Sequence, residues 1–372
     1  MIIKNADVFT EDGIFTSKDV YIDGELFSET AEGEVIDGTG CYAIPGLVDI
    51  HFHACVGHDF CDGTREAIDA MAEYEASQGV TAIVPATMTL GRDTLKKICE
   101  TAGAYGNTNE KGAELCGINM EGPFISMAKK GAQNPLYIHK PDVEMFRELN
   151  AASGNMIKLV ALAPEEEGAM EFIDALKDEV VISIAHTTAD AETAAEALGR
   201  GACHVTHLYN AMPPFHHRKP GVVGAACDDE KCNVELICDG VHIHPKMVRA
   251  TFKMFGAERV VLISDSMMAT GMPDGTYSLG GQVVVVKGNL ATLEDGTIAG
   301  SNTNLMNCLR IVVKDMKIPL ETAVLCASRN PAKCVGIYDR YGSIRPGKVA
   351  SMVLLNKEDL SIKQVILRGR LL

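Results

Sequence analysis

The stretch "PGLVDIHFHACVGHDF" runs from Pro45 to Phe60 and decides how the rest of the chain is interpreted. Its first half is an apolar run of the kind that forms a buried strand. The run ends in His51 and His53, which are two residues apart. Because side chains alternate across a strand, both imidazoles lie on the same face. A core favours valine or leucine at such positions, so the pair indicates a functional site at the end of this strand.

Seven further apolar segments of strand length follow, and most are separated by segments of helical periodicity such as 64–78 and 92–106. The eight strand candidates are residues 46–53, 79–88, 114–123, 156–165, 180–187, 203–210, 233–243 and 259–267. Near-continuous apolar runs between helices are typical of parallel strands covered on both faces. Eight such units predict an α/β protein with a closed (β/α)8 barrel of the TIM type. A doubly wound open sheet is the alternative, but no G-x-G-x-x-G follows the first strand.

The two ends of the chain have a different pattern from the middle. Residues 1–44 and 345–372 contain short strand-like runs and turns, which predicts a small β-sandwich domain formed by both termini. Residues 45–344 then form the catalytic barrel. Residues 274–301 look like a β-hairpin or meander inserted after the eighth strand.

Composition excludes several classes of function. The 372 residues carry 34 basic and 50 acidic side chains, a net charge of −16, which makes nucleic acid and anionic membranes poor candidates for partners. No signal-peptide pattern and no apolar run of about 20 residues is found, so we expect a cytoplasmic protein. The twelve cysteines form no C-x-x-C pair and are expected to be reduced core residues. Cys55 and Cys61, near the histidine pair, leave a metal role as a lesser alternative.

Ligand-type side chains recur where the predicted strands end. Because the carboxyl ends of barrel strands converge on one site, these side chains are expected to meet there. Imidazole and carboxylate groups together suit zinc, iron and similar divalent ions. The predicted metal ligands are His51, His53, Glu121, His186, His207 and Asp265. Asp239 and His242, at the end of the seventh strand, are equally compatible with substrate contact and with an ordinary structural role.

A metal ion of this kind predicts hydrolytic chemistry. It lowers the pKa of bound water and polarises a carbonyl group. Asp265, alone at the end of the eighth strand, is placed to act as general base on that water and to pass the proton to a leaving nitrogen. Serine or cysteine nucleophiles are disfavoured, because the chain has no G-x-S-x-G motif and no cysteine with an evident base partner.

With these residues placed, the chain resembles the amidohydrolase superfamily and, within it, the N-acetylglucosamine-6-phosphate deacetylase family. The superfamily features are "PGLVDIHFH", the order of eight strands, Asp265 and the closing "GSIRPGKVASMVLL". The narrower features include "MEGPFISMAKKGAQNP", "THLYNAMPPFHHRKPGVVGAA", "CDGVHIHP", "LISDSMMATGMPDGTYSLGG" and "GTIAGSNTNL". The resemblance covers nearly the whole chain in the same order.

The resemblance implies a reaction, a cofactor and roles for particular residues. The family removes acetate from N-acetylglucosamine 6-phosphate, with one or two divalent ions, zinc first and iron, manganese or cobalt as alternatives. Glu121, His186 and His207 would be the shared ligands, with His51 and His53 holding a second ion. Asp265 and His242 would be catalytic. The implied substrate-binding residues are Ala132, Gln133, Asn210, Ala211, Arg218, His242, Ile298, Ala299 and Gly300. The family also implies a homodimer, with the Arg218 loop reaching across the interface.

The chain departs from the family pattern at three positions, and three alternative functions remain open. Gln133 stands where many relatives carry a histidine, Ala54 replaces a common glycine, and Ser266 replaces a smaller residue. N-acetylgalactosamine 6-phosphate or another N-acyl sugar phosphate would therefore fit equally well. A cyclic-amide hydrolase usually uses a carboxylated lysine, but Lys158 lies early in the fourth strand. A non-catalytic binding barrel should lose metal ligands, and this chain keeps all six.

Overall fold

A closed barrel of parallel strands forms the centre of the molecule. The computed structural model describes residues 1–372, and in it eight strands occupy the eight predicted segments. They are β8 (Leu47–Asp49), β11 (Val80–Ile83), β13 (Ile118–Met120), β14 (Ile157–Leu162), β15 (Val181–Ile184), β16 (His204–Val205), β17 (Asn233–Ile237) and β18 (Val260–Ile263). β11 pairs with β8 and with the short β12 (Glu114–Leu115), and β13 to β18 form a continuous parallel ladder. Backbone hydrogen bonds from Asp265 to His51 and from Asn119 to Pro85 close the two seams.

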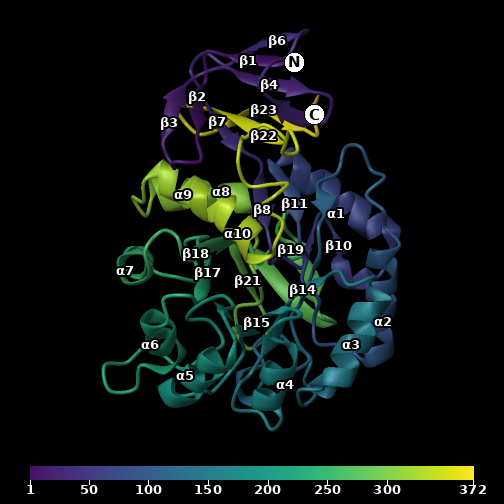
Figure 1. Cartoon of the computed structure of the whole chain (residues 1–372). Helices are drawn as coiled ribbons and strands as arrows, with labels where there is room; N and C mark the ends of the chain where they lie inside the picture. The colour runs from purple at the N-terminus through teal and green to yellow at the C-terminus, as the bar shows by residue number, and fades with distance from the viewer.

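A helix follows each barrel strand and packs on its outer face (Figure 1). The eight are α1 (Arg65–Ser77), α2 (Arg92–Gly103), α3 (Val143–Ala152), α4 (Ala169–Leu176), α5 (Ala191–Arg200), α6 (Gly221–Asp228), α7 (Pro245–Phe255) and α8 (Leu305–Lys314). Side-chain caps define where several begin: Thr64, Asp142 and Asp190 each accept a hydrogen bond from the third residue of their helix. The strand–helix alternation confirms the predicted (β/α)8 barrel.

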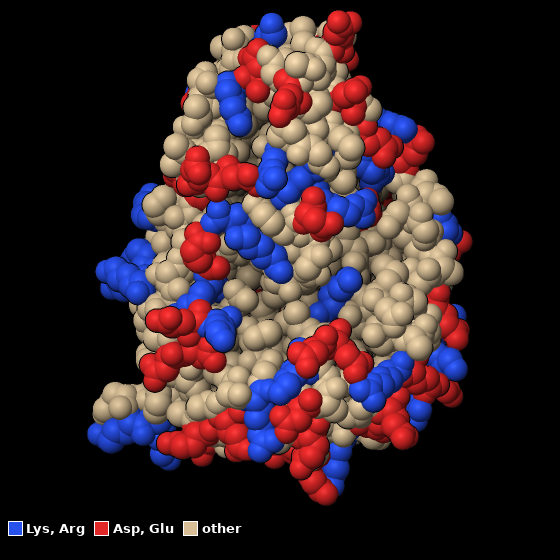
Figure 2. All heavy atoms as spheres, in the orientation of Figure 1, with Lys and Arg blue, Asp and Glu red and all other residues tan.

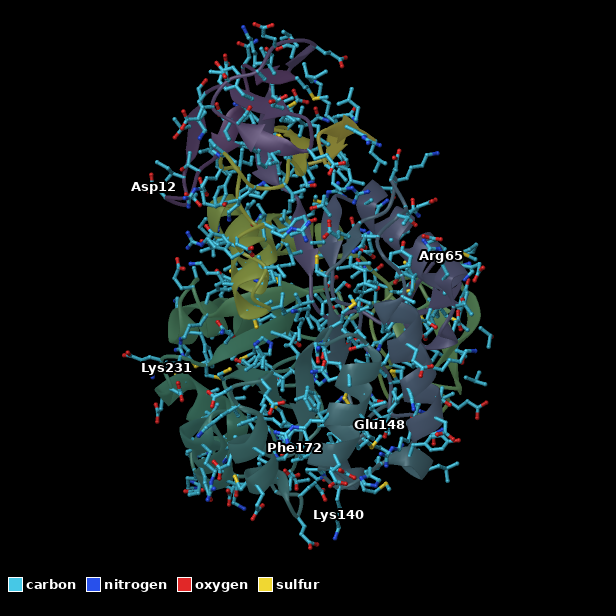
Figure 3. All side chains as sticks on the ribbon, turned by 45° about the vertical axis from the view of Figure 1, so that its right-hand side comes forward. Asp12, Arg65, Lys140, Glu148, Phe172 and Lys231 are labelled. Carbon is cyan, nitrogen blue, oxygen red and sulfur yellow. The ribbon has the colours of Figure 1, made fainter.

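The apolar core lies between the strands and the helices. Phe172 of α4, labelled in Figure 3, is fully buried, and its ring lies 5.2 Å from that of Phe124 and 6.0 Å from that of Phe146. Two more helices, α9 (Leu320–Ala327) and α10 (Arg329–Cys334), complete the helical part of the chain. Ala332 and Tyr341 pack with interior strand residues such as Val48, so α10 and the segment that follows it fill the amino-terminal end of the barrel.

The termini build two small sheets at one end of the barrel (Figure 1). One sheet has the order β5–β4–β1–β6 and the other the order β24–β23–β22–β7–β2–β3. Their strands are β1 (Ile2–Lys4), β2 (Asp7–Phe9), β3 (Phe15–Ser17), β4 (Val20–Asp23), β5 (Leu26–Ser28), β6 (Val35–Asp37), β7 (Cys41–Pro45), β22 (Met352–Asn356), β23 (Ile362–Leu367) and β24 (Arg370–Leu371). The chain passes from β7 into β8 through Gly46, where a Cβ atom would lie 2.1 Å from the Thr81 hydroxyl. Only glycine fits at this crossing.

The inserted segment forms an antiparallel meander, as predicted. It consists of β19 (Gly275–Leu279), β20 (Gln282–Lys287) and β21 (Leu290–Thr292). Leu279, Val284 and Val286 pack with Met88 and Met267, which lie just past the ends of two barrel strands. The remaining short elements are β9 (Ala54–Cys55), β10 (His58–Asp59), η1 (Phe60–Asp62), η2 (Met127–Lys129) and η3 (Pro135–Tyr137).

All twelve cysteines are free thiols. On the face shown in Figure 2, basic and acidic side chains are interspersed over the barrel and the terminal sheets. None of the helices combines the length and the apolar composition needed to cross a bilayer.

Glu75 on α1 is an acidic residue buried without partners. Its side chain is fully buried, and neither carboxylate oxygen has a hydrogen-bond partner. Burial raises the pKa of Glu75 well above its usual value, and the negative charge of the buried Asp49 raises it further. The folded protein therefore holds a proton on Glu75 at pH values where the unfolded chain has released it.

We expect Glu75→Gln to change the pH dependence of stability. Because the folded pKa is the higher one, the contribution of Glu75 to the unfolding free energy falls as pH rises above about 4.3, by up to about 1.4 kcal/mol per pH unit until the folded pKa is passed. Glutamine does not titrate. The Tm difference between variant and wild type, measured by thermal denaturation from pH 4 to 8, should therefore grow with pH in favour of the variant. A difference independent of pH would contradict a protonated Glu75.

Candidate active site

Glu121 lies at the centre of four histidines at the carboxyl end of the barrel. Its Oε1 atom lies 3.4 Å from His51 Nε2, 3.2 Å from His186 Nε2 and 3.1 Å from His207 Nε2. Its Oε2 atom lies 3.2 Å from His53 Nε2. The five side chains are nearly inaccessible to solvent. The structure therefore brings together side chains that are up to 156 residues apart in the chain.

Asp265 adds a second carboxylate to this cluster. Its Oδ1 atom lies 3.4 Å from His53 Nε2 and 3.8 Å from His51 Nε2. All six residues predicted as metal ligands are thus neighbours. Their ligand atoms include two overlapping groups whose members lie within 4.8 Å of one another, and Glu121 belongs to both: His51–His53–Glu121 and Glu121–His186–His207.

Three of these residues leave their strands in an unusual backbone conformation. His186, His207 and Asp265 have φ angles of 43°, 28° and 49°, in the left-handed region that residues with a Cβ seldom adopt. Each of these residues lies two positions past the end of its strand, where its own side chain joins the cluster. Such strain costs about 1–3 kcal/mol per residue and is concentrated at functional sites.

The donor set fits a divalent cation. His186 Nδ1 lies 2.9 Å from the carbonyl oxygen of Lys129, so Nδ1 carries the hydrogen and Nε2 presents its lone pair. That Nε2 atom lies 3.2 Å from Glu121 Oε1 and 3.2 Å from His207 Nε2. Lone pairs facing one another at these distances repel unless a proton or a cation lies between them. Neutral imidazole and carboxylate are the ligands that zinc and related ions take.

Both carboxylates of the cluster are ionised at neutral pH. Burial raises the pKa of Glu121, but the charge of a protonated His51, and hydrogen bonds in which His186 and His207 supply the proton, outweigh burial and hold the pKa well below its usual range. Burial also raises the pKa of Asp265. The hydrogen bond with His53 and the charges of His51 and His53 lower it by more, so the pKa of Asp265 lies below its usual value. An ionised Asp265 is able to accept a proton.

Two further residues hold the cluster in place, a role that the sequence did not reveal. Gln133 donates from Nε2 to Glu121 Oε2 at 2.6 Å and accepts at Oε1 from the Thr89 amide at 2.7 Å. Glu235, in the middle of β17, lies 2.8 Å from His51 Nδ1. An acidic residue inside the apolar run "NVELIC" is the signal that could have identified Glu235.

His242 forms a pair with Asp239. His242 Nδ1 lies 2.7 Å from Asp239 Oδ2, and Asp239 Oδ1 accepts hydrogen bonds from the backbone amides of Val241 and His242. Burial lowers the pKa of His242, but the hydrogen bond and the charge of Asp239, with a contribution from Asp265, raise it above its usual value. Asp239 therefore fixes the orientation of the imidazole and favours its protonated form.

A cavity of about 360 Å³ opens beside the cluster. Besides His53, Glu121, His186, His207 and Asp265, it is lined by seven of the residues implied for substrate binding: Ala132, Gln133, Asn210, Ala211, His242, Ile298 and Gly300. Two predicted residues do not line it. Ala299 is fully buried behind its neighbours, and Arg218 is an exposed loop residue. Lys129 is the one lysine or arginine that lines this cavity.

The backbone around Ala211 leaves one amide free. Ala211 has a φ of 51°, and its carbonyl accepts a hydrogen bond from the Thr187 amide. The Asn210 amide donates to the His207 carbonyl, whereas the Ala211 amide donates to no group in the chain. This N–H group at the cavity wall is therefore free to donate a hydrogen bond to an anionic oxygen.

Comparisons with known proteins agree with this geometry. Residues 42–372 match the Amidohydrolase family. The chain is 37% identical over its full length to an N-acetylglucosamine-6-phosphate deacetylase of Bacillus subtilis, covering 93% of that protein. It is 34% identical to an N-acetylgalactosamine-6-phosphate deacetylase of Escherichia coli, over 88% of this chain and 86% of that protein. The structure of a mutant N-acetyl-D-glucosamine-6-phosphate deacetylase of Mycobacterium smegmatis, in complex with N-acetyl-D-glucosamine-6-phosphate, superposes with a TM-score of 0.92 at 30% identity, covering 100% of this chain and 98% of that one.

Removing one histidine from the cluster should release bound metal. We expect His53→Asn and His186→Asn each to weaken metal binding by more than about 100-fold, since even changes to residues behind the ligands cost about 10- to 100-fold. Metal content after dialysis, measured by inductively coupled plasma mass spectrometry, checks this.

His244→Asn is the matched control for these variants. His244 is an exposed histidine that caps α7, a position where asparagine is equally suitable. Its metal content should equal that of the wild type. Equal metal content in all four proteins would rule out the cluster as the metal site.

Proposed function

The chain belongs to the amidohydrolase family, and we propose that it hydrolyses N-acetylglucosamine 6-phosphate to glucosamine 6-phosphate and acetate. The observation that carries this proposal is the position of Asp265, ionised and against two histidines of the cluster, at the wall of a cavity of about 360 Å³. That arrangement suits attack of water on an amide held in the cavity. The deacetylases of known specificity that the chain resembles over most of its length support the choice of substrate.

One or two divalent ions would be held by the cluster. Glu121, His186 and His207 would hold one ion, and His51, His53 and Glu121 the other, with Asp265 beside it. Zinc is the first choice for this donor set, with iron, manganese and cobalt as alternatives. When bound, such an ion supplies Lewis acidity, which makes water a nucleophile at neutral pH and polarises a carbonyl group.

Asp265 moves the proton in this proposal. Its carboxylate takes a proton from the attacking water and then gives it to the amide nitrogen, so that the C–N bond breaks to leave acetate and a free amine. The left-handed backbone at Asp265 is held by two hydrogen bonds, from its own amide to His51 and from the Ser301 amide to its carbonyl. The backbone of Asp265 is thus tied to the segment after β8 and to the segment after the meander.

His242 orients the substrate. Because its Nδ1 is engaged by Asp239, only Nε2 is free to contact a ligand in the cavity. Because its pKa is raised, the imidazole more readily takes up a second proton, which Nε2 can donate to the amide carbonyl or to a sugar oxygen. The free Ala211 amide would donate a hydrogen bond to an anionic oxygen, and Asn210 lies beside it.

The proposed substrate has one competing candidate, which is the galacto epimer of the same sugar phosphate. The similarity to an N-acetylgalactosamine-6-phosphate deacetylase favours the galacto epimer as the second choice. Both substrates carry the same N-acetyl and phosphate groups, so the residues that perform the chemistry do not distinguish them. The meander residues Leu279, Thr297 and Ile298 line the cavity and are placed to contact the sugar.

Acetate release from the two phosphorylated sugars tests the proposal. We expect the metal-loaded wild type to hydrolyse N-acetylglucosamine 6-phosphate in preference to the galacto epimer and to the sugar without phosphate. Asp265→Asn should lower kcat by roughly 100- to 10,000-fold, the range that general acid–base catalysis supplies.

The control variant is Asp12→Asn, which changes an exposed aspartate at the edge of the terminal sheets (Figure 3). It should retain wild-type activity. If metal-loaded wild type releases no acetate from any of these sugars, the substrate assignment is wrong. The family membership would stand, and other N-acyl and cyclic amides would be the next substrates to assay.

Arg218 is proposed to serve the active site of a second subunit. Its side chain belongs to an exposed loop and does not line the cavity of its own chain. A homodimer in which this loop reaches the neighbouring cavity would bring a guanidinium group to the phosphate, which arginine binds through paired hydrogen bonds.

Mixing two inactive variants tests this arrangement. Arg218→Ala and Asp265→Asn should each be defective alone. After exchange of subunits, half of the sites in a mixed dimer combine an intact Asp265 with an intact Arg218 from the other chain, so roughly a quarter of wild-type activity should return in a random mixture. Size-exclusion chromatography with light scattering would confirm that dimers are present. No recovery in a population of exchanged dimers would mean that Arg218 does not act across the interface.

A further inference from the structure

Glu235 is a fully buried carboxylate inside the barrel. It lies in the middle of β17, on a strand whose other residues, Val234, Leu236 and Ile237, are buried and apolar. Burying a carboxylate costs several kcal/mol unless hydrogen bonds compensate for the lost hydration. The contacts of Glu235 therefore indicate its role.

The carboxylate contacts three donors, and two of them belong to residues of the metal cluster. Oε2 lies 2.8 Å from His51 Nδ1 and accepts from the backbone amide of His207 at 3.0 Å. Oε1 lies 3.0 Å from His204 Nε2. The Cys334 thiol lies 3.3 Å from His204 Nδ1, so the thiol donates to Nδ1 and Nε2 carries the hydrogen toward Glu235. Each oxygen of Glu235 is thus satisfied.

The bond to His51 decides which nitrogen of that ring is available. Because Glu235 accepts from Nδ1, the lone pair of the neutral His51 ring is on Nε2, the atom that faces Glu121 and Asp265. His51 Nε2 is buried and has no hydrogen-bond partner. His53 is different, since its Nδ1 has no partner at all. Of the two histidines that follow β8, only His51 has a hydrogen bond at its Nδ1 atom.

We propose that Glu235 is the positioning residue that makes His51 a metal ligand, and that it thereby sets the affinity of the protein for the ion shared by His51, His53 and Glu121. This inference rests on the proposed metal-dependent function. Glu235 reaches His207 through the backbone amide alone, leaving both ring nitrogens of His207 free of it. Its influence is therefore greatest on the group that contains His51.

Glu235→Gln tests the assignment with little change in volume. Glutamine offers one oxygen, so it cannot accept from all three donors, and its NH₂ group must face at least one of them. We expect the zinc affinity of the metal-stripped variant to fall about 10- to 100-fold, the usual cost of altering a group that holds a metal-binding histidine. Competition with a chromogenic chelator measures the affinity. The absorption spectrum of the Co²⁺-loaded protein reports on the ligand geometry.

His51→Asn supplies the decisive comparison. If Glu235 acts through His51, the loss caused by Glu235→Gln should disappear in the His51→Asn background, because the residue that it positions is gone. Glu75→Gln is the matched control, since Glu75 is also a fully buried glutamate but has no hydrogen-bond partner. It should leave zinc affinity and the Co²⁺ spectrum unchanged.

Two results would overturn the proposal: an unchanged zinc affinity in folded Glu235→Gln, or an equal loss with and without His51. Glu235→Asp, which keeps the charge and withdraws the carboxylate, carries the same test if the glutamine variant does not fold. Metal binding is measured without any sugar. A failure of the deacetylase assignment would therefore be seen in acetate release and would leave this measurement intact.

Discussion

The contact on which the rest of the structure depends is the one between Glu121 and four imidazoles. A carboxylate buried this deeply is tolerated only where positive charge or hydrogen-bond donors surround it. Here the four histidines come from β8, β15 and β16, and Glu121 itself follows β13. The site thus requires the ends of four strands to meet within a few ångströms, which a closed barrel achieves and an open sheet of the same strands would not.

The backbone is strained where it has to meet that requirement. His186, His207 and Asp265 adopt left-handed conformations, which are unfavourable for residues with a Cβ. Each is held by hydrogen bonds that cross to a neighbouring segment: the Ser126 amide donates to the His186 carbonyl, for example, and the Asp265 amide donates to the His51 carbonyl. The rigid strands supply the positions, and the strained turns direct the side chains inward. The stability of the barrel thus offsets the strain at the site.

The sequence was sufficient to predict which histidines and acids meet at the mouth of the barrel, and insufficient for the residues that hold them in place. Histidines and acids at strand ends are visible because they interrupt a regular pattern, and the barrel rule states where strand ends go. Glu235 and Gln133 lie elsewhere in the pattern, and their partners are far away in the chain, His51 and Glu121 respectively. Such contacts depend on the register and the shear of the closed barrel, which one sequence does not reveal.

A contact between distant parts of the chain also connects two of the residues that depart from the family pattern, Ala54 and Ser266. Ala54 and Ser266 are 212 residues apart, yet the Ser266 hydroxyl donates to the Ala54 carbonyl at 2.7 Å, and the backbone amides of His53 and Ala54 both donate to the Ser266 carbonyl. They form one contact that joins the loop after β8 to the loop after β18. That contact lies beside His53 and Asp265, so it ties the backbone around one histidine of the cluster to the backbone around the proposed base. The Ser266 hydroxyl and the backbone of Ala54 therefore help to hold the proposed catalytic aspartate in place.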